Sequence, residues 1–202
     1  MTSTPSHPSP APHVPALHAV HHRIETFTDD PQTEAAQMAT RLTRFEQLGI
    51  GTEGVEVLDE IAHDMGERAD FLYAMVNAFG AQQTFLGLRN PPRDAGYPIV
   101  GRTMSRSHGW CPEVVRRKLS LPLPNVAASP RFASNLVVDA IGIQSYFGSP
   151  VIDAHTGLAL LTVCIIDPEP RTLHDARRVL AIVKDTARTA ADTLQIVTPP
   201  AP

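Results

Sequence analysis

The segment at residues 143–167, IQSYFGSPVIDAHTGLALLTVCIID, carries the clearest secondary-structure signal in the chain. Residues 158–166 form an apolar run with the length of a buried strand, and residues 144–152 form a second strand-like run before it. Between them, residues 153–157 have the composition of a turn. The segment therefore predicts two successive strands of an antiparallel sheet.

Three more strands are predicted upstream. Residues 70–79 and 83–88 are rich in β-branched and aromatic side chains, and a short turn at Gly80 joins them into a hairpin. Residues 121–126 form a strand that two prolines interrupt. Because proline cannot donate to a strand ladder, we expect this strand at an edge of the sheet. Residues 90–109 form a long polar loop, a length that is uncommon unless the loop has a function.

Four helices are predicted, over residues 30–48, 54–67, 111–119 and 172–197. Pro31 and Pro112 stand where a first helical turn accepts proline, and Asp30 is the expected N-cap of the first helix. Thr172 and Asp175 resemble a capping box at the start of the last helix. The order of elements predicts an α+β fold: an antiparallel β-sheet flanked by helices, with the long N- and C-terminal helices on one face.

The last helix carries a regular apolar seam. Its members recur at spacings of three and four residues: Leu173, Ala176, Leu180, Val183, Ala187, Ala190, Leu194 and Val197. We expect such a long seam to exceed what one domain can cover. The sequence therefore predicts a homodimer in which residues 33–48 and 172–197 pair with their copies.

Composition excludes several classes of protein. The formal net charge of −4 provides no basic field for nucleic acid. No stretch approaches the roughly 18 apolar residues of a membrane span, and the N-terminal residues lack the basic-then-apolar order expected of a signal peptide. Two cysteines far apart in sequence form neither a disulfide framework nor a zinc site, so we expect a reducing cytoplasm and no metal.

The chain divides into four predicted parts. Residues 1–29 are rich in Pro, Ser, Thr and His without apolar periodicity, so we expect a disordered tail whose histidines hold no specific metal. Residues 30–52 are the first helix and a linker, residues 53–197 are the domain, and residues 198–202 are a second disordered tail.

Residues 53–197 resemble a GAF domain, a small-ligand and signal-sensing relative of PAS domains. The resemblance rests on short motifs in the second half of the chain: Cys111, Arg131, Phe132, Asn135, Ile143, Gly148, Pro150, Gly157, Cys164, Ile166, Asp167, Pro170 and Arg171. The resemblance implies a sensory or regulatory domain that binds a small molecule or senses redox state. We expect its output to pass through the dimer helices to a partner signalling protein rather than through catalysis.

The sequence departs from particular branches of that family. Pro112 follows Cys111 where a bilin-binding domain has histidine, so a bilin is not expected, and neither is haem. The sequence lacks the cyclic-nucleotide motif of the family. The resemblance to free methionine sulfoxide reductases implies a thiol enzyme as the alternative, although that branch uses three cysteines and this chain has two. A ligand-free scaffold for dimerisation is a second alternative.

The predicted ligand-binding residues centre on Cys111, which would be the catalytic residue of a thiol enzyme. Its place at a helix start favours the thiolate, although a cysteine there can also be a buried apolar residue. The other candidates surround the pocket that the resemblance implies: His108, Trp110, Arg131, Phe132, Asn135 and Tyr146. Arg131 can clamp an anion or pair with Asp139 or Asp167. Cys164 is interpreted as an apolar strand residue, or as the resolving thiol if the protein is a thiol enzyme.

Overall fold

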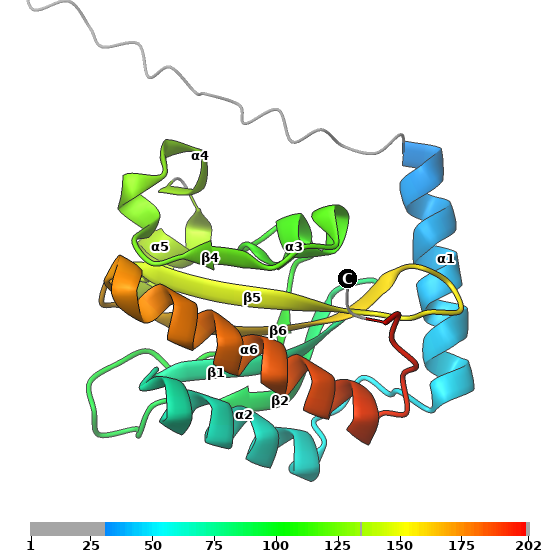
Figure 1. Cartoon of the computed structure of the whole chain (residues 1–202), viewed down its shortest axis with the longest axis horizontal. Coiled ribbons are helices and arrows are strands. Elements are labelled where there is room, and N and C mark those ends of the chain that lie inside the picture. The colour runs from blue at the N-terminus through cyan, green and yellow to red at the C-terminus, as the bar shows by residue number, and fades with distance from the viewer. Residues whose placement is uncertain (1–30, 134, 201–202) are drawn as a thin grey trace, which may run out of the picture.

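Six antiparallel strands form the central sheet of the computed structural model, in the order β3-β2-β1-β6-β5-β4 (Figure 1). The structure describes residues 31–133 and 135–200, so the predicted tail at 1–29 and the Asp30 cap lie outside the described part. The strands are β1 Tyr73–Phe79, β2 Gln83–Arg89, β3 Thr103–Met104, β4 Leu121–Leu123, β5 Ser145–Ile152 and β6 Ala159–Asp167.

The helices are α1 Pro31–Leu48, α2 Glu56–Ala69, α3 Cys111–Arg117, α4 Pro130–Ala133, α5 Leu136–Ile141 and α6 Leu173–Thr193, with a 3-10 turn at Val126–Ala128. The predicted α+β class, the hairpin β1–β2, the edge position of β4 and the β5–β6 pair are confirmed. The sequence interpretation missed α4 and α5, which occupy a stretch left without elements, and the short strand β3 inside the predicted loop.

Helices α2 and α6 cover one face of the sheet (Figure 1). Alternate side chains of β1 and β6, such as Val76, Val163 and Ile165, point into this layer and form the larger hydrophobic core. Helix α2 lies so close to β2 that a side chain at Gly87 would overlap the backbone carbonyl of Leu58. This close approach explains the glycine inside the strand.

The apolar seam of α6 is buried within its own chain. Val183, Ala187 and Ala190 pack against the sheet and α2, while Leu173 at one end is 81% exposed and Val197 beyond the other end is 55% exposed. The expectation that one domain could not cover the seam is therefore wrong, because α2 and the sheet together form a groove that accepts it. The dimer itself stays a prediction.

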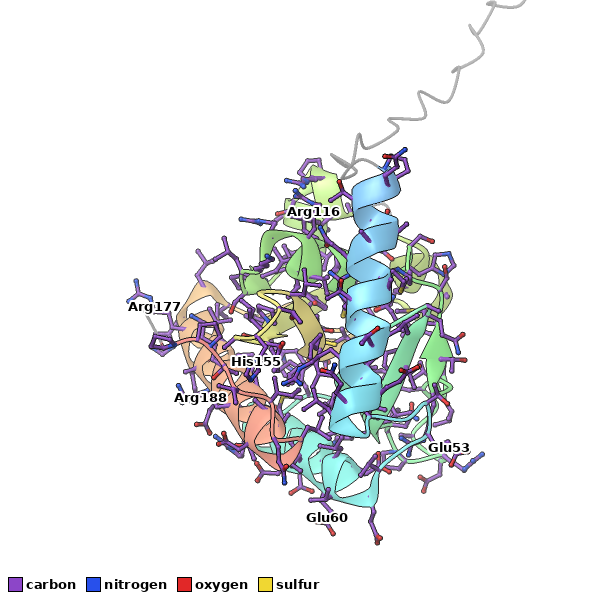
Figure 2. All side chains as sticks on the ribbon, turned by 90° about the vertical axis from the view of Figure 1, so that its right-hand side faces the viewer. Glu53, Glu60, Arg116, His155, Arg177 and Arg188 are labelled. Carbon is purple, nitrogen blue, oxygen red and sulfur yellow. The ribbon has the colours of Figure 1, made fainter. Side chains whose placement is uncertain are left out.

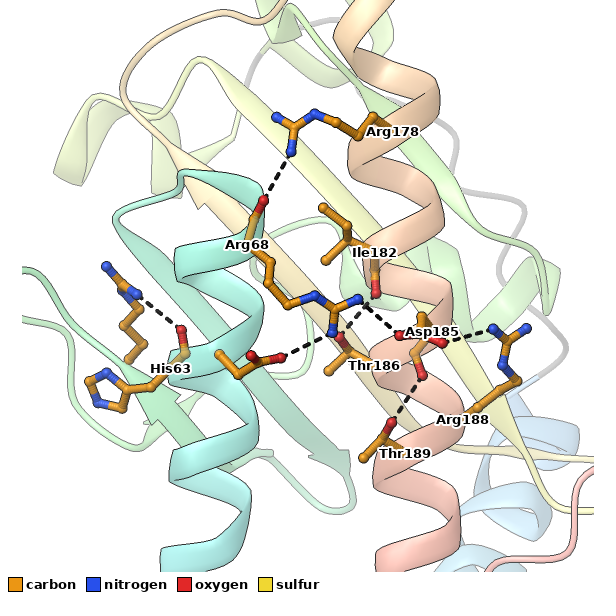
Figure 3. Close-up of polar contacts among 10 residues, drawn as sticks. His63, Arg68, Arg178, Ile182, Asp185, Thr186, Arg188 and Thr189 are labelled. Carbon is orange, nitrogen blue, oxygen red and sulfur yellow. Dashed lines mark hydrogen bonds and ion pairs between the residues drawn. The ribbon is translucent and has the colours of Figure 1, made fainter.

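Polar contacts join α2 and α6 along their outer side (Figure 3). The Arg68 guanidinium donates to Asp64 at 3.0 Å on its own helix and to Asp185 of α6 at 2.9 Å. Arg178 donates to the Arg68 carbonyl at 2.9 Å, and Arg188 donates to Asp185 at 2.9 Å. These exposed pairs fix the rotation of the two helices more than they add stability.

Helix α1 stands across the ends of the strands, where Figure 2 shows it in front of the sheet, rather than beside α6 on the covered face. Phe45 contributes its ring to the core, and Arg41 donates to the Ala159 carbonyl at 3.0 Å. Arg44 donates to the buried Asp153 carboxylate at 3.2 Å, in the turn before β6. Both terminal helices are thus present as predicted, but they pack on different parts of the sheet.

Within the described residues, no helix has both the length and the apolar character that a membrane span requires.

Candidate functional site

The second face of the sheet holds a cavity of about 310 Å³. The sheet forms its floor, and α3, α5 and the loop before α3 form its walls. The lining is largely apolar. Its polar and sulfur-bearing members are Met75, Thr103, Met104, His108, Cys111, Tyr146 and Cys164, together with the Trp110 ring. A cavity of this size lies at the lower end of the range of small-molecule sites, roughly 300–1,000 Å³.

Two cysteines from distant parts of the sequence meet at the floor of this cavity. Cys111 is the first residue of α3, Cys164 lies in the middle of β6, and their Sγ atoms are 3.6 Å apart. Both side chains are buried. The Tyr146 hydroxyl lies 3.5 Å from the Cys111 Sγ. Neither cysteine has any other thiol near it, so the two form an isolated pair.

Gly148 places the tyrosine in this site. Tyr146 and Gly148 lie on the same face of β5, and Gly148 pairs in register with Cys164 of β6. A side chain at Gly148 would overlap the Tyr146 ring and hydroxyl. The missing side chain therefore lets the ring lie flat across the strand and brings its hydroxyl to the sulfurs.

The surroundings of the two thiols give them different pKa values. The hydrogen bond with Cys164 is the largest influence on the pKa of Cys111, which is lowered to about 6. Burial opposes this shift, whereas hydrogen bonds with Thr162 and Tyr146 add to it. The same Cys111 contact, together with burial, raises the pKa of Cys164. Burial raises the pKa of Tyr146, which stays a hydroxyl. Cys111 is therefore the more acidic thiol of the pair, the one at which a thiolate forms first.

A buried polar network continues from the thiols along the same face. Asn77 Nδ2 donates to Gln83 at 2.9 Å and to Thr162 at 3.2 Å. Gln83 Nε2 donates to the carbonyls of Ser105 and His108, at 2.7 and 2.9 Å. The network thus ties the cavity-side loop to the sheet and holds the segment that precedes Cys111.

Four of the predicted site residues line the cavity: His108, Trp110, Cys111 and Tyr146. Trp110 is buried, its ring centroid is 5.1 Å from that of Tyr146, and its Nε1 donates to the Phe132 carbonyl at 3.2 Å. Trp110 is therefore a fixed wall of the cavity rather than an exposed stacking surface.

The other three predicted residues do not line the cavity. Arg131 is 51% exposed and pairs with Glu113 of α3 at 2.7 Å, which differs from the expected partners, since Asp167 pairs with Arg171 and the Asp139 side chain lies outside the described part. Phe132 packs from α4 against the core behind Trp110. The Asn135 side chain accepts from the Val137 amide at 3.1 Å and starts α5. These residues brace the wall that carries Cys111.

Sequence reasoning underrated Cys164 and missed the sulfur of Met75. The alternation of β6 places Thr162, Cys164 and Ile166 on one face, a signal available in the sequence. Nothing local in the sequence shows that α3 would cover this face of β6. Among the described residues, no group of three or more His, Cys, Asp or Glu side chains converges on a metal position.

Comparison with known proteins gives similar folds at low sequence identity. No protein-family model and no curated protein matches the sequence. The GAF domain of A. aeolicus nlh2, in an inactive state, superposes with a TM-score of 0.52 and 11% identity, covering 80% of this chain and 97% of that one. The free methionine-R-sulfoxide reductase from Neisseria meningitidis, in complex with its substrate, gives 0.51 and 14%, covering 84% and 96%.

The GAF domain of Thermosynechococcus elongatus PixJ, in its blue-light absorbing form, is also similar, with a TM-score of 0.51 and 9% identity over 76% of this chain and 89% of that one. These proteins differ in what they do, so the likeness concerns architecture. The six-stranded antiparallel sheet with its flanking helices agrees with this architecture, and the chain has a GAF-domain fold.

Proposed function

We propose that this protein is a sensory domain that binds a small, largely apolar molecule in the cavity and responds to the redox state of the thiol pair at its floor. One observation carries the proposal: a cavity of about 310 Å³ contains a thiolate-forming cysteine within 3.6 Å of a second thiol. A ligand in the cavity would contact Cys111, and oxidation of the pair would change the floor on which that ligand rests.

The polar groups of the lining support binding with a fixed orientation. His108 stands on the loop that Gln83 holds, and Tyr146 presents its hydroxyl beside Cys111. Few polar groups among apolar walls are typical of a small-molecule site. A packed pocket would have favoured the ligand-free scaffold, whereas the cavity favours binding of a small molecule.

The proposed output passes through α3 and the cavity walls to the helices on the surface. Oxidation by a peroxide, which accepts two electrons and two protons and leaves as water or as an alcohol and water, would join the two sulfurs as a disulfide. This would bring them from 3.6 Å to about 2.05 Å and pull the start of α3 toward β6. The same movement shifts Glu113, which holds Arg131 and Arg116 on the surface. The signal therefore has a physical path from the thiols to a surface that a partner protein can contact.

A thiol enzyme is the second candidate, because the sulfurs satisfy the distance that a resolving cysteine needs. The Cys111 thiolate would attack a sulfoxide or peroxide and, with one proton, take up its oxygen as a sulfenic acid, which releases the thioether, alcohol or water as the two-electron-reduced product. Cys164 would then displace water or hydroxide to leave a disulfide, and an external dithiol would restore both thiols. The similarity to a free methionine-R-sulfoxide reductase favours testing this chemistry. Steady turnover that disappears in both Cys111→Ser and Cys164→Ser would establish it.

The binding proposal is tested by native and denaturing mass spectra of freshly purified protein, recorded side by side. We expect extra mass in the native spectrum of the wild type. Ala140→Phe fills the cavity from α5 and should remove that mass, whereas Ala128→Phe, outside the cavity lining, should retain it. Extra mass that persists equally in Ala140→Phe, or a wild type that retains no molecule from a library of small apolar compounds, would overturn the proposal.

A further inference from the structure

Sulfur is unusually concentrated at the cavity floor. Two thiols and two thioethers, from Cys111, Cys164, Met75 and Met104, line the same cavity, although the chain has only two cysteines and five methionines. We propose that this floor is a binding site for one soft, monovalent metal ion of the copper(I) type, held by the thiolates of Cys111 and Cys164 and the thioether of Met75. The site shares its thiols with the proposed function but needs no organic ligand.

The separation of the two sulfurs fits one shared ion. Two thiolates that each lie about 2.3 Å from a metal, at a tetrahedral angle, are roughly 3.8 Å apart. The Cys111 and Cys164 sulfurs are 3.6 Å apart, so a bridging ion requires almost no movement of α3 or β6. A disulfide requires the sulfurs to approach by about 1.5 Å more, given its bond length of about 2.05 Å.

The third donor comes from the neighbouring strand. Met75 of β1 pairs in register with Cys164 of β6, so the two side chains lie side by side on the cavity face of the sheet. Both line the cavity, and both are 3% exposed. Met104 enters the same cavity from β3 and is the available fourth sulfur.

The chemistry of the donors selects the ion. Thiolates and thioethers prefer soft ions such as copper(I), while structural zinc sites take four thiolate or imidazole ligands and magnesium and calcium take oxygen ligands. No cluster of three His, Cys, Asp or Glu residues exists in the described part of the chain, so a complete zinc site is not available there. The largely apolar lining gives the ion a surrounding of low polarity, which favours the lower oxidation state of copper.

The surroundings of the sulfurs suit an anionic two-thiolate site. Each thiol that coordinates loses its proton to solvent, and the metal keeps its oxidation state, so binding releases protons without electron transfer. The Tyr146 hydroxyl, 3.5 Å from the Cys111 sulfur, stays in place to donate to a coordinated thiolate. Gly148 keeps that hydroxyl there, because any side chain at this position would displace the ring.

The test is an anaerobic titration of the full-length, reduced protein with copper(I) in competition with a chromophoric copper(I) chelator. We expect one tightly bound ion per chain and an ultraviolet thiolate-to-copper absorption band. Cys111→Ser and Cys164→Ser should each abolish the band, and Met75→Leu, which conserves volume, should weaken affinity by about tenfold or more. Zinc(II) in the same titration should not compete.

Controls separate this site from other copper ligands. The histidines of residues 1–29 can bind copper, but such binding is retained in both serine variants and gives no thiolate band. A band and affinity that survive Cys164→Ser, or a Met75→Leu variant that binds as tightly as the wild type, would overturn the three-sulfur site. Binding of an organic molecule is measured separately, in metal-free protein. A failure of copper(I) binding therefore does not decide the test of small-molecule binding, and the reverse also holds.

Discussion

Cys111 and Cys164 show how one hydrogen bond differentiates two identical side chains. The two sulfurs are 3.6 Å apart, and this contact is the largest influence that lowers the pKa of Cys111 and raises the pKa of Cys164. The helix start contributes a favourable field, but the largest influence is the neighbouring thiol. Reactivity at Cys111 is thus a property of the pair.

This difference predicts how alkylation of Cys111 depends on pH. We expect the rate with iodoacetamide to rise through an apparent pKa of about 6, below the ordinary cysteine value of about 8.5, because the thiolate is the nucleophile. Replacing the neighbour in Cys164→Ala should move the midpoint upward. Mass spectrometry of quenched samples locates the label. Equal midpoints in the two proteins would contradict a role for Cys164 in this shift.

Gly148 predicts a local effect on stability. Gly148→Ala forces the Tyr146 ring from its position over β5, so we expect a loss of about 1–3 kcal/mol of unfolding free energy, as for other overpacked sites. Urea denaturation measures it. Gly51→Ala is the matched control, since nothing lies within 4 Å of a side chain added there. Equal stabilities of the two variants would show that the strand relaxes at no cost.

Helix α1 depends on one buried carboxylate. Asp153 lies in the turn between β5 and β6 and accepts from Thr156 at 2.9 Å and from Arg44 of α1 at 3.2 Å. Burial by itself would raise the pKa of Asp153, but hydrogen bonds from Thr156 and Arg44 together lower it. The carboxylate therefore stabilises the folded state while it is ionised.

The sign of this shift predicts a pH-dependent variant. Because the folded-state pKa lies below the ordinary value of about 3.9, the stabilisation is complete above that value and is lost as the pH falls through the lower folded pKa. Asp153→Asn should cost about 1–3 kcal/mol at pH 7, and its deficit relative to the wild type should shrink below about pH 4. Asp94→Asn, at an exposed loop position, should match the wild type throughout. A deficit that does not change between pH 7 and pH 3 would assign the effect to packing.

The elements that the sequence predicted are those with a strong period or a clear cap. Thr172 accepts from the Asp175 amide and starts α6 as expected, and the apolar run of β6 forms a central strand. Helices α4 and α5 escaped prediction because each is a turn or two long, too short to show a helical period. The site was predicted at Cys111 and Tyr146. Cys164 was placed beside Cys111 only in the thiol-enzyme alternative, because the contact between α3 and β6 joins residues 53 positions apart.

Across the whole molecule, the two terminal helices bury different amounts of apolar surface. Helix α6 buries its seam in the domain, while α1 buries only Arg41 and Phe45 of its 18 residues and leaves Leu42 40% exposed. An 18-residue helix with so little buried surface is marginal by itself. If the predicted homodimer forms, the outer side of α1 is therefore the surface with most to gain from a second copy.

The dimer predicts that stability depends on protein concentration. A folded dimer that dissociates on unfolding has a urea midpoint that rises with concentration, because mass action favours the associated state. We expect this rise in the wild type, together with a dimer mass in sedimentation equilibrium. Leu42→Glu on α1 should remove both, whereas Leu173→Glu, exposed at the start of α6, should retain them if α1 carries the contact. Midpoints that stay constant over a hundredfold range of wild-type concentration would contradict the dimer, and the signal from the cavity would then have to act within a single chain.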